Sequence, residues 1–106
     1  YMRFKKMVSE QASHEKDIKF YADRLSVTPK HLTKLIKSIT GQSAKKIIND
    51  TLILISGYKL KNTDASVSKI SEELSFSDSP SFCKFFKKQT GLTPLEYRNT
   101  YSESSI

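Results

Sequence analysis

The chain of 106 residues has no tryptophan, three glycines, three prolines and one cysteine, Cys83. One cysteine permits no internal disulfide and no cysteine metal cluster, which is typical of a protein of the reducing cytosol. The longest strictly apolar run is residues 52–55, whereas a membrane span needs about 20 residues. No signal peptide is apparent either. We therefore expect a folded, soluble protein with no membrane span.

Motifs for catalysis and for cofactor binding are also missing. The sequence has no glycine-rich phosphate loop and no Ser, His and Asp cluster at motif spacing. His14 and His31 have no ligand partners at metal-binding spacing, so we expect no metal. Glu72 and Glu73 are adjacent, so on a helix they point about 100° apart rather than at one substrate. We therefore expect that the protein is not an enzyme and that it binds no cofactor.

Acidic residues are in short supply. Asp and Glu total 11 against 18 Lys and Arg, which gives a net charge of +7. The excess is concentrated, since residues 26–50 carry +4 and residues 51–75 carry none. A polyanion, either nucleic acid or an anionic membrane surface, is therefore the first partner to consider.

Strict alternation of apolar and polar residues is absent, whereas apolar residues recur at helical spacing along almost the whole chain. This pattern predicts an all-α fold with about seven helices. We expect one helix over about 2–13, one after Asp17, one from Pro29 to Thr40, and a longer one from Ala44 towards Leu60. Two further helices are expected after residue 66, and Thr93-Pro94 opens a short last helix that carries Leu95, Tyr97 and Tyr101.

Apolar stripes on these helices predict the core. The long helix is apolar on nearly every side, so we expect residues 52–55 to be buried between or against both halves of the protein. The stripes expected to face the core are Leu32, Leu35, Ile36 and Ile39 on one helix and Phe82, Phe85 and Phe86 on another.

The second half of the sequence repeats the first. Leu74-Ser75-Phe76 echoes Leu25-Ser26-Val27 at an offset of 49, and Thr90-Gly91 echoes Thr40-Gly41 at an offset of 50. One residue has therefore been added in the second turn, and each copy is a helix, a tight turn and a helix. The expected organisation is an N-terminal subdomain at 1–42, a linker helix at 43–62, a C-terminal subdomain at 63–101 and a tail at 102–106.

A helix, tight turn and helix whose second helix is apolar inside and basic outside is typical of a DNA-reading helix-turn-helix. Such a helix fits the major groove, where polar side chains reach base edges and lysines neutralise phosphates. A linker helix of about 17 residues rises about 25 Å, so one chain could read two adjacent groove segments. The candidate DNA-binding residues are Lys30, His31, Thr33, Lys34 and Lys37 in the first unit and Ser79, Pro80, Cys83, Lys84, Lys87 and Lys88 in the second.

The stretches ISEELSFSD at 70–78 and FCKFFKKQTGLTPLEYR at 82–98 resemble the DNA-binding domain of AraC/XylS-type transcription regulators. The resemblance runs from about Ile18 to Arg98 and implies two helix-turn-helix units joined by a central helix. It also implies binding to double-stranded promoter DNA, usually activation through RNA polymerase, and a cytoplasmic, nucleoid-associated location in bacteria. A sensor or signalling domain normally lies on the N-terminal side and is absent here. Tyr1 in place of a start methionine fits a piece of a longer protein.

Several residues depart from the family pattern. Ser71 stands where the family prefers Ala, Ser75 where it prefers Gly, and Lys84 where Arg is frequent. Gly57 lies inside the linker helix, where it costs about 1 kcal/mol relative to Ala, so we expect bending or fraying there. These departures support the alternative that the chain is a helical protein-interaction domain that keeps the fold without specific DNA binding. The lysines would then be solvated surface only.

Overall fold

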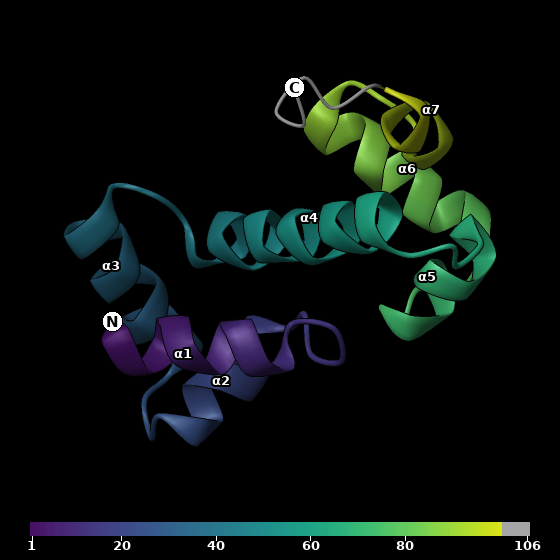
Figure 1. Cartoon of the computed structure of the whole chain (residues 1–106). Coiled ribbons are helices and arrows are strands. Elements are labelled where there is room, and N and C mark those ends of the chain that lie inside the picture. Colours follow the sequence, from purple (N-terminus) through teal and green to yellow (C-terminus); the bar gives the residue numbers. More distant parts are fainter. Residues whose placement is uncertain (101–106) are drawn as a thin grey trace. The chain divides into compact units, whose positions relative to one another are not determined.

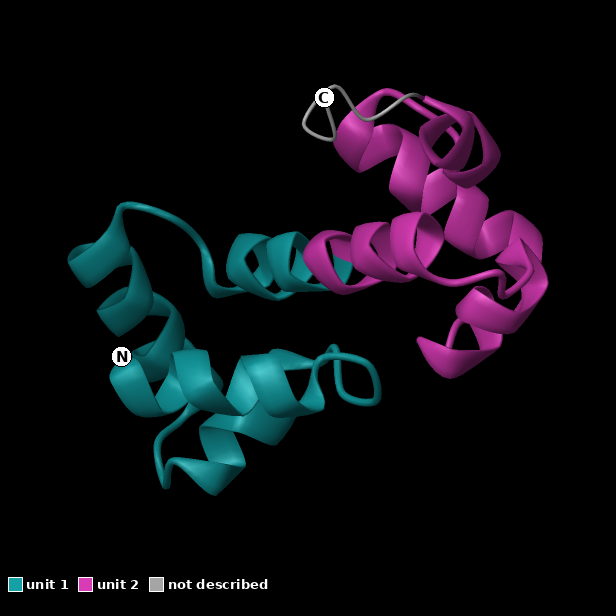
Figure 2. Ribbon diagram, viewed as in Figure 1, with its two compact units in different colours: residues 1–52 teal, residues 53–106 magenta. Residues whose placement is uncertain are grey.

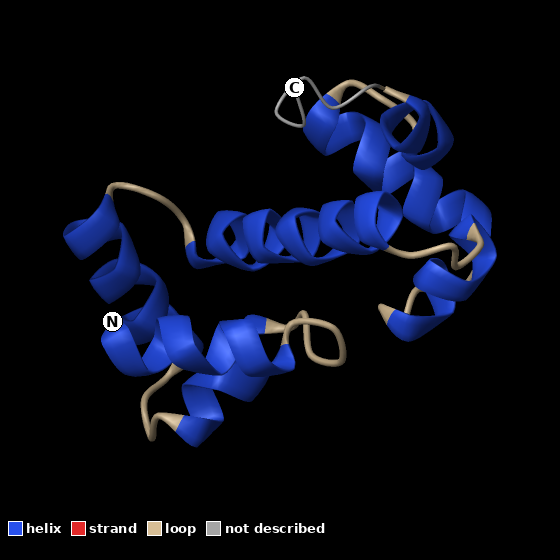
Figure 3. Ribbon diagram, in the orientation of Figure 1, coloured by secondary structure: helices blue, strands red, loops and turns tan. Residues whose placement is uncertain are grey.

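The computed structural model of the chain describes residues 1–100, within which it contains helices and no strand (Figures 1 and 3). The predicted all-α fold is confirmed, whereas Tyr101 and the expected tail at 102–106 lie outside the described residues. None of the described helices is both long enough and apolar enough to span a lipid bilayer. The helices are α1 (Met2–Gln11), α2 (Ile18–Arg24), α3 (Pro29–Thr40), α4 (Ala44–Asn62), α5 (Val67–Glu73), α6 (Ser79–Thr90) and α7 (Pro94–Asn99).

The chain forms two compact units, residues 1–52 and 53–106 (Figure 2). The boundary between them falls inside α4, so each unit includes one part of the helix that the sequence predicts as a linker. The first unit contains α1 to α3, and the second contains α5 to α7. Each unit therefore contains one complete copy of the repeated pair of helices.

The core of the first unit is built around Tyr21, which is fully buried. Its ring meets the ring of Phe4 edge to face, with 5.6 Å between centroids, and its hydroxyl donates to the Glu15 carbonyl at 2.5 Å. Burial, with a smaller contribution from the Glu15 carboxylate, raises the pKa of Tyr21 to about 12. The phenol is thus a neutral core group. The other buried apolar residues of this unit are Phe4, Val8, Ala12, Ala22, Leu32, Ile36, Ala44, Ile48 and Leu52.

An aromatic cluster forms the core of the second unit. The Phe86 ring contacts the rings of Phe82 and Tyr97 at centroid distances of 5.8 and 5.3 Å. The Phe76 ring adds a contact with Phe82 at 5.2 Å. Leu60, Ile70 and Leu74 complete the buried apolar set.

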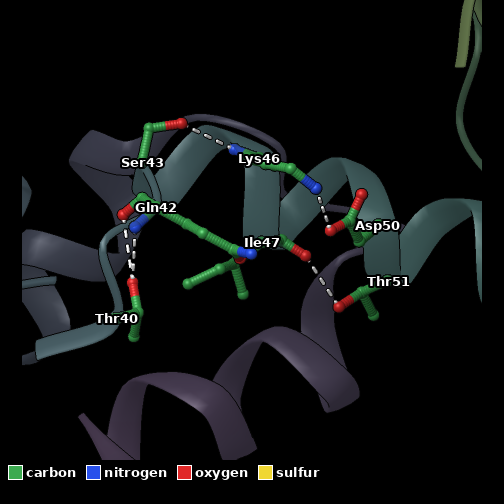
Figure 4. Close-up of polar contacts among 7 residues, drawn as sticks. All are labelled: Thr40, Gln42, Ser43, Lys46, Ile47, Asp50 and Thr51. Carbon is green, nitrogen blue, oxygen red and sulfur yellow. Dashed lines mark hydrogen bonds and ion pairs between the residues drawn. The ribbon is translucent and has the colours of Figure 1, made fainter. Parts of the chain in front are cut away.

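The beginning of α4 shows how local polar contacts fix a helix in place (Figure 4). The Ser43 hydroxyl accepts from the backbone N–H of Lys46 at 3.1 Å, so Ser43 caps the helix that the sequence predicts from Ala44. One turn on, Lys46 Nζ pairs with Asp50 Oδ2 at 2.8 Å. The Thr51 hydroxyl donates to the Ile47 carbonyl at 2.9 Å.

Burial along α4 corrects the expectation that residues 52–55 are all buried. Leu52 is 1% exposed, but Leu54 is 75% exposed and Tyr58 is 67% exposed. The reason is that buried positions on α4 recur every four residues and therefore form one stripe. Ile53 and Ile55 lie at the margin of this stripe and are half-buried. The stripe consists of Ala44, Ile48, Leu52, Ser56 and Leu60.

The apolar stripes of the paired helices need a similar correction. Leu35 and Ile39 on α3 are 39% and 53% exposed, Phe85 on α6 is half-buried, and Leu95 on α7 is 58% exposed. In a unit of about 50 residues, each short helix has few neighbours, so its apolar face is covered along its centre only. The stripe centres are indeed buried, and they are Leu32, Ile36, Phe82 and Phe86.

The fraying expected at Gly57 is wrong, because α4 continues as a helix through this residue to Asn62. A Cβ atom at Gly57 would lie 3.2 Å from the Tyr97 hydroxyl, so the glycine admits the tyrosine ring beside the helix. Arg98 holds the end of the same helix, where its Nε donates to the Leu60 carbonyl at 2.9 Å. Packing against α7 therefore offsets the low helix propensity of glycine.

Candidate nucleic-acid interface

Both turns between the paired helices have the same backbone conformation. Ser26 and Ser75, the serines matched by the sequence repeat, adopt φ values of +59° and +62°. This left-handed region is uncommon for residues other than glycine. The next residue in each turn makes the same backbone hydrogen bond, from Val27 N to Ala22 O and from Phe76 N to Ser71 O, at 3.0 Å in both cases.

The ends of α3 and α6 repeat one another as well. Gly41 and Gly91 follow these helices with φ values of +74° and +87°, and the preceding threonines make identical contacts. The Thr40 hydroxyl donates to the Ile36 carbonyl at 2.8 Å and accepts from Gln42 N at 3.0 Å. The Thr90 hydroxyl does the same with Phe86 and Leu92. The structure thus confirms the predicted duplication in backbone detail.

Helices α3 and α6 differ at their N-terminal caps. Thr28 Oγ1 accepts from the backbone N–H of His31 at 3.0 Å, whereas Asp78 Oδ1 accepts from Ser81 N at 2.7 Å. Hydrogen bonds from Ser81 hold the pKa of the Asp78 carboxyl below its usual value. The turn before α6 runs over residues 74–78, one residue longer than 25–28.

Ser71 has a specific role in the longer turn. Its side chain is buried, and its hydroxyl donates to the backbone carbonyl of Asp78 at 3.0 Å. Alanine at this position could not satisfy that carbonyl. The departure from the family pattern at Ser71 is therefore accommodated by a hydrogen bond across the turn.

The first candidate surface is the outer face of α3. Leu32 and Ile36 face the core, and every predicted DNA-binding residue of this helix is exposed. The Thr33 hydroxyl donates to the Pro29 carbonyl at 2.8 Å, which leaves its oxygen available as an acceptor. The exposed set is Lys30, His31, Thr33, Lys34 and Lys37.

The second candidate surface is the outer face of α6, where fewer of the predicted residues are fully exposed than on α3. Pro80 and the three lysines Lys84, Lys87 and Lys88 are exposed, whereas Ser79 and Cys83 are half-buried. Ser79 lines a polar cavity of about 170 Å³, together with Ser68, Ser71, Glu72, Phe76, Ser77 and Asp78. Within each unit, the structure brings the predicted residues together on one helix face.

The structure places three further exposed charged residues at helix starts, and none of them is among the residues predicted from the sequence: Asp78 before α6, and Lys45 and Lys46 in the first turn of α4. Asp78 has a local signal, because an Asp followed by Ser and Pro is typical of a helix start with its cap. The lysine pair directly follows Ala44, the residue at which the sequence predicts the long helix to begin. The hydrogen bond between Arg98 and Leu60 joins residues 38 positions apart, so no local pattern could indicate it.

Comparisons with known proteins agree with this architecture. The family described as "Helix-turn-helix domain" matches residues 21–100. The transcriptional regulatory protein YesN of Bacillus subtilis is 38% identical over 85 residues, which are 78% of this chain and 23% of YesN. The Msm operon regulatory protein of Streptococcus mutans is 31% identical over 94 residues, 89% of this chain and 34% of that protein.

Solved structures show the same fold. The C-terminal domain of AraT, a response regulator from Geobacillus stearothermophilus, superposes with a TM-score of 0.86 at 25% identity, covering 96% of this chain and 87% of that one. The DNA-binding domain of AdpA gives a TM-score of 0.84 at 20% identity, covering 94% and 90% of the two chains.

The fold is that of a double helix-turn-helix domain. The chain belongs to the AraC-type helix-turn-helix family, whose members are DNA-binding domains of transcription regulators rather than enzymes. The family predicted from the sequence is confirmed. The chain spans about a quarter of the length of YesN and about a third of the length of the Msm operon regulatory protein.

Proposed function

We propose that the chain binds double-stranded promoter DNA sequence-specifically, with α3 and α6 each reading one segment of the major groove. The observation that carries this proposal is the repeat: two helices with matching turns and ends, each with a buried apolar centre and exposed lysines. A helix displayed in this way fits the major groove, and its N-terminal residues approach the base edges.

The chemistry of the exposed residues supports separate roles. Lys34 and Lys84 occupy equivalent positions in the two repeats and are exposed, which suits contacts with phosphates. His31, Thr33 and Cys83 lie closer to the helix starts and offer short polar groups to base edges. Lysine cannot recognise guanine through the planar fork of an arginine, so Lys84 contributes charge more than base identity.

The relatives support the regulatory part of the proposal. The AdpA domain was solved in complex with a target DNA, and RhaR of Escherichia coli, 26% identical over 83 residues, is a transcriptional activator. We infer that this chain is likewise the DNA-binding part of an activator that contacts RNA polymerase. In the longer protein, a sensor or signalling domain would precede it.

The first test is to select bound sequences from a random duplex library and to titrate the enriched duplex across a salt series. We expect a bipartite motif whose half-sites lie about one helical turn apart. Lys34→Ala and Lys84→Ala should each weaken binding to the enriched duplex about fivefold near physiological salt and flatten the salt slope by about one unit. Lys5→Ala, which removes an exposed lysine on α1, is the matched control and should change neither quantity.

Three results would count against the proposal. No enrichment, or a shallow salt slope, would favour the alternative of a protein-interaction domain that has kept the fold. A single enriched half-site would show that only one reading helix contacts bases. Full binding by both lysine variants, with unchanged thermal stability, would place the reading surface elsewhere.

A further inference from the structure

The two helix-turn-helix units carry different charges although their reading helices have equal numbers of lysines. Residues 18–40 contain five basic and one acidic residue, whereas residues 67–90 contain four basic and three acidic residues. Their net charges are therefore +4 and +1. Sequence-independent attraction to DNA depends on this charge, so the units are not electrostatically equivalent.

The contrast is sharpest at the first turn of each reading helix. The cap of α3 is the neutral Thr28, and Lys30 follows two residues later. The cap of α6 is Asp78, and Pro80 stands at the position equivalent to Lys30. The first turn is thus positive on one reading helix and negative on the other, at the end of the helix that approaches the base edges.

Asp78 presents its charge at the surface. The residue is exposed and, like any exposed aspartate, is ionised at neutral pH; hydrogen bonds from Ser81 hold its pKa below the usual value. Glu73, the other acidic residue without an acidic counterpart in the first unit, is paired with Lys59 at 3.1 Å. Much of the charge of Glu73 is compensated locally, which leaves Asp78 as the uncompensated negative charge that adjoins the first turn of α6.

A helix N-terminus normally attracts phosphate, because its free N–H groups and its dipole favour negative charge. At α6 the Asp78 carboxylate already occupies that position and repels a second anion. At α3 the hydroxyl of Thr28 caps the helix without charge, so the attraction for phosphate remains. The same backbone geometry therefore favours the DNA backbone in one unit and disfavours it in the other.

We propose that the first helix-turn-helix holds DNA of any sequence, whereas Asp78 prevents the second from engaging until its base contacts are correct. This inference rests on the proposed function of DNA binding and deepens it. Asp78 is then a specificity-determining residue: it lowers affinity for wrong sequences more than affinity for the right one. The second half-site becomes the position at which the protein discriminates.

The test uses the whole chain with two probes, the duplex selected above and an unselected 30-base-pair duplex. On the unselected duplex, Lys34→Ala should flatten the salt slope by about one unit, and Lys84→Ala should leave it almost unchanged. On the selected duplex, both substitutions should flatten it. If the two substitutions flatten the salt slope on the unselected duplex equally, the proposed difference between the two helix-turn-helix units is overturned.

The cap variants test Asp78 directly. Asp78→Asn retains a good capping residue and should raise affinity for the unselected duplex about fivefold, with a smaller gain on the selected one. In this background, Lys84→Ala should now flatten the slope on unselected DNA. Glu10→Gln, which makes the same change in net charge on α1, is the control and should leave the ratio of the two affinities unchanged.

The reciprocal swap provides a second, charge-neutral comparison. Thr28→Asp with Asp78→Thr keeps the net charge and gives both helices a capping residue. In this swapped protein, we expect Lys84→Ala to flatten the salt slope on unselected DNA and Lys34→Ala to leave it almost unchanged. Persistence of the wild-type pattern would overturn the role of Asp78. If the wild-type protein itself shows no salt-dependent binding to the selected duplex, the proposed function is overturned instead.

Discussion

At the scale of single residues, the two turns depend on serines in a conformation that suits glycine. Ser26 and Ser75 both have left-handed φ values, which brings the following backbone N–H to the carbonyl that closes the turn. A side chain in this region costs about 1 kcal/mol because Cβ crowds the following carbonyl oxygen. The family preference for glycine at Ser75 thus has a physical reason, and both serines retain the conformation against that cost.

Ser26→Gly should therefore stabilise the first unit. Relief of the left-handed strain exceeds the extra entropy of glycine in the unfolded chain, so we expect a gain of about 0.5 kcal/mol in the free energy of unfolding. Ser26→Val should lose about 1 kcal/mol, because a β-branched residue is least tolerant of this region. Urea titrations followed by circular dichroism measure both changes. Stabilisation by valine, or a large loss with glycine, would contradict the strain at Ser26.

At the scale of elements, α4 shows how few positions of an apolar helix need to be buried. Its buried residues recur at intervals of four, and Leu54 lies two residues after Leu52, about 200° around the helix axis. Ser56 belongs to the buried stripe, where its hydroxyl donates to the Ile53 carbonyl at 3.2 Å.

The stripe predicts opposite outcomes for two neighbouring leucines. Leu52→Asp places an unpaired charge at a site that is 1% exposed and should cost more than about 3 kcal/mol, enough to unfold much of the protein. Leu54→Asp, at a site 75% exposed, should change stability by less than about 0.5 kcal/mol. Thermal unfolding of both variants decides the matter. Similar losses in the two would show that α4 is buried all round, as the sequence alone suggests.

Local signals predicted most of the elements. Thr28 and Pro29 begin α3 where the sequence places them, and Gly41 ends it, because capping and left-handed termination depend on adjacent residues only. Exposure was less predictable. The apolar residues Leu35 and Leu54 are exposed because spacing shows which side of a helix is apolar but not how much protein covers that side.

At the scale of the whole molecule, the residues predicted to bind DNA lie on two helix faces, one in each unit. The lysines could be found from the sequence because they recur at equivalent positions in a repeat. The half-burial of Ser79 and Cys83 could not be predicted from the sequence, since it depends on how α6 packs behind the longer second turn. The charge difference between the units was visible in the sequence, but the hydrogen bond by which Asp78 caps α6 is seen only in the structure.

The division into two units also predicts how the protein unfolds. Each unit has its own aromatic core, around Tyr21 in the first and Phe86 in the second, and α4 is the continuous element between them. Phe86→Ala should remove about 3–5 kcal/mol from the second core, more than a unit of about 50 residues readily withstands. Amide exchange followed by NMR should then show protection lost over residues 67–100 and retained over 18–40. Loss of protection in both ranges would mean that the chain unfolds as one cooperative body. Selective loss would mean that one helix-turn-helix unit can unfold while the other stays folded.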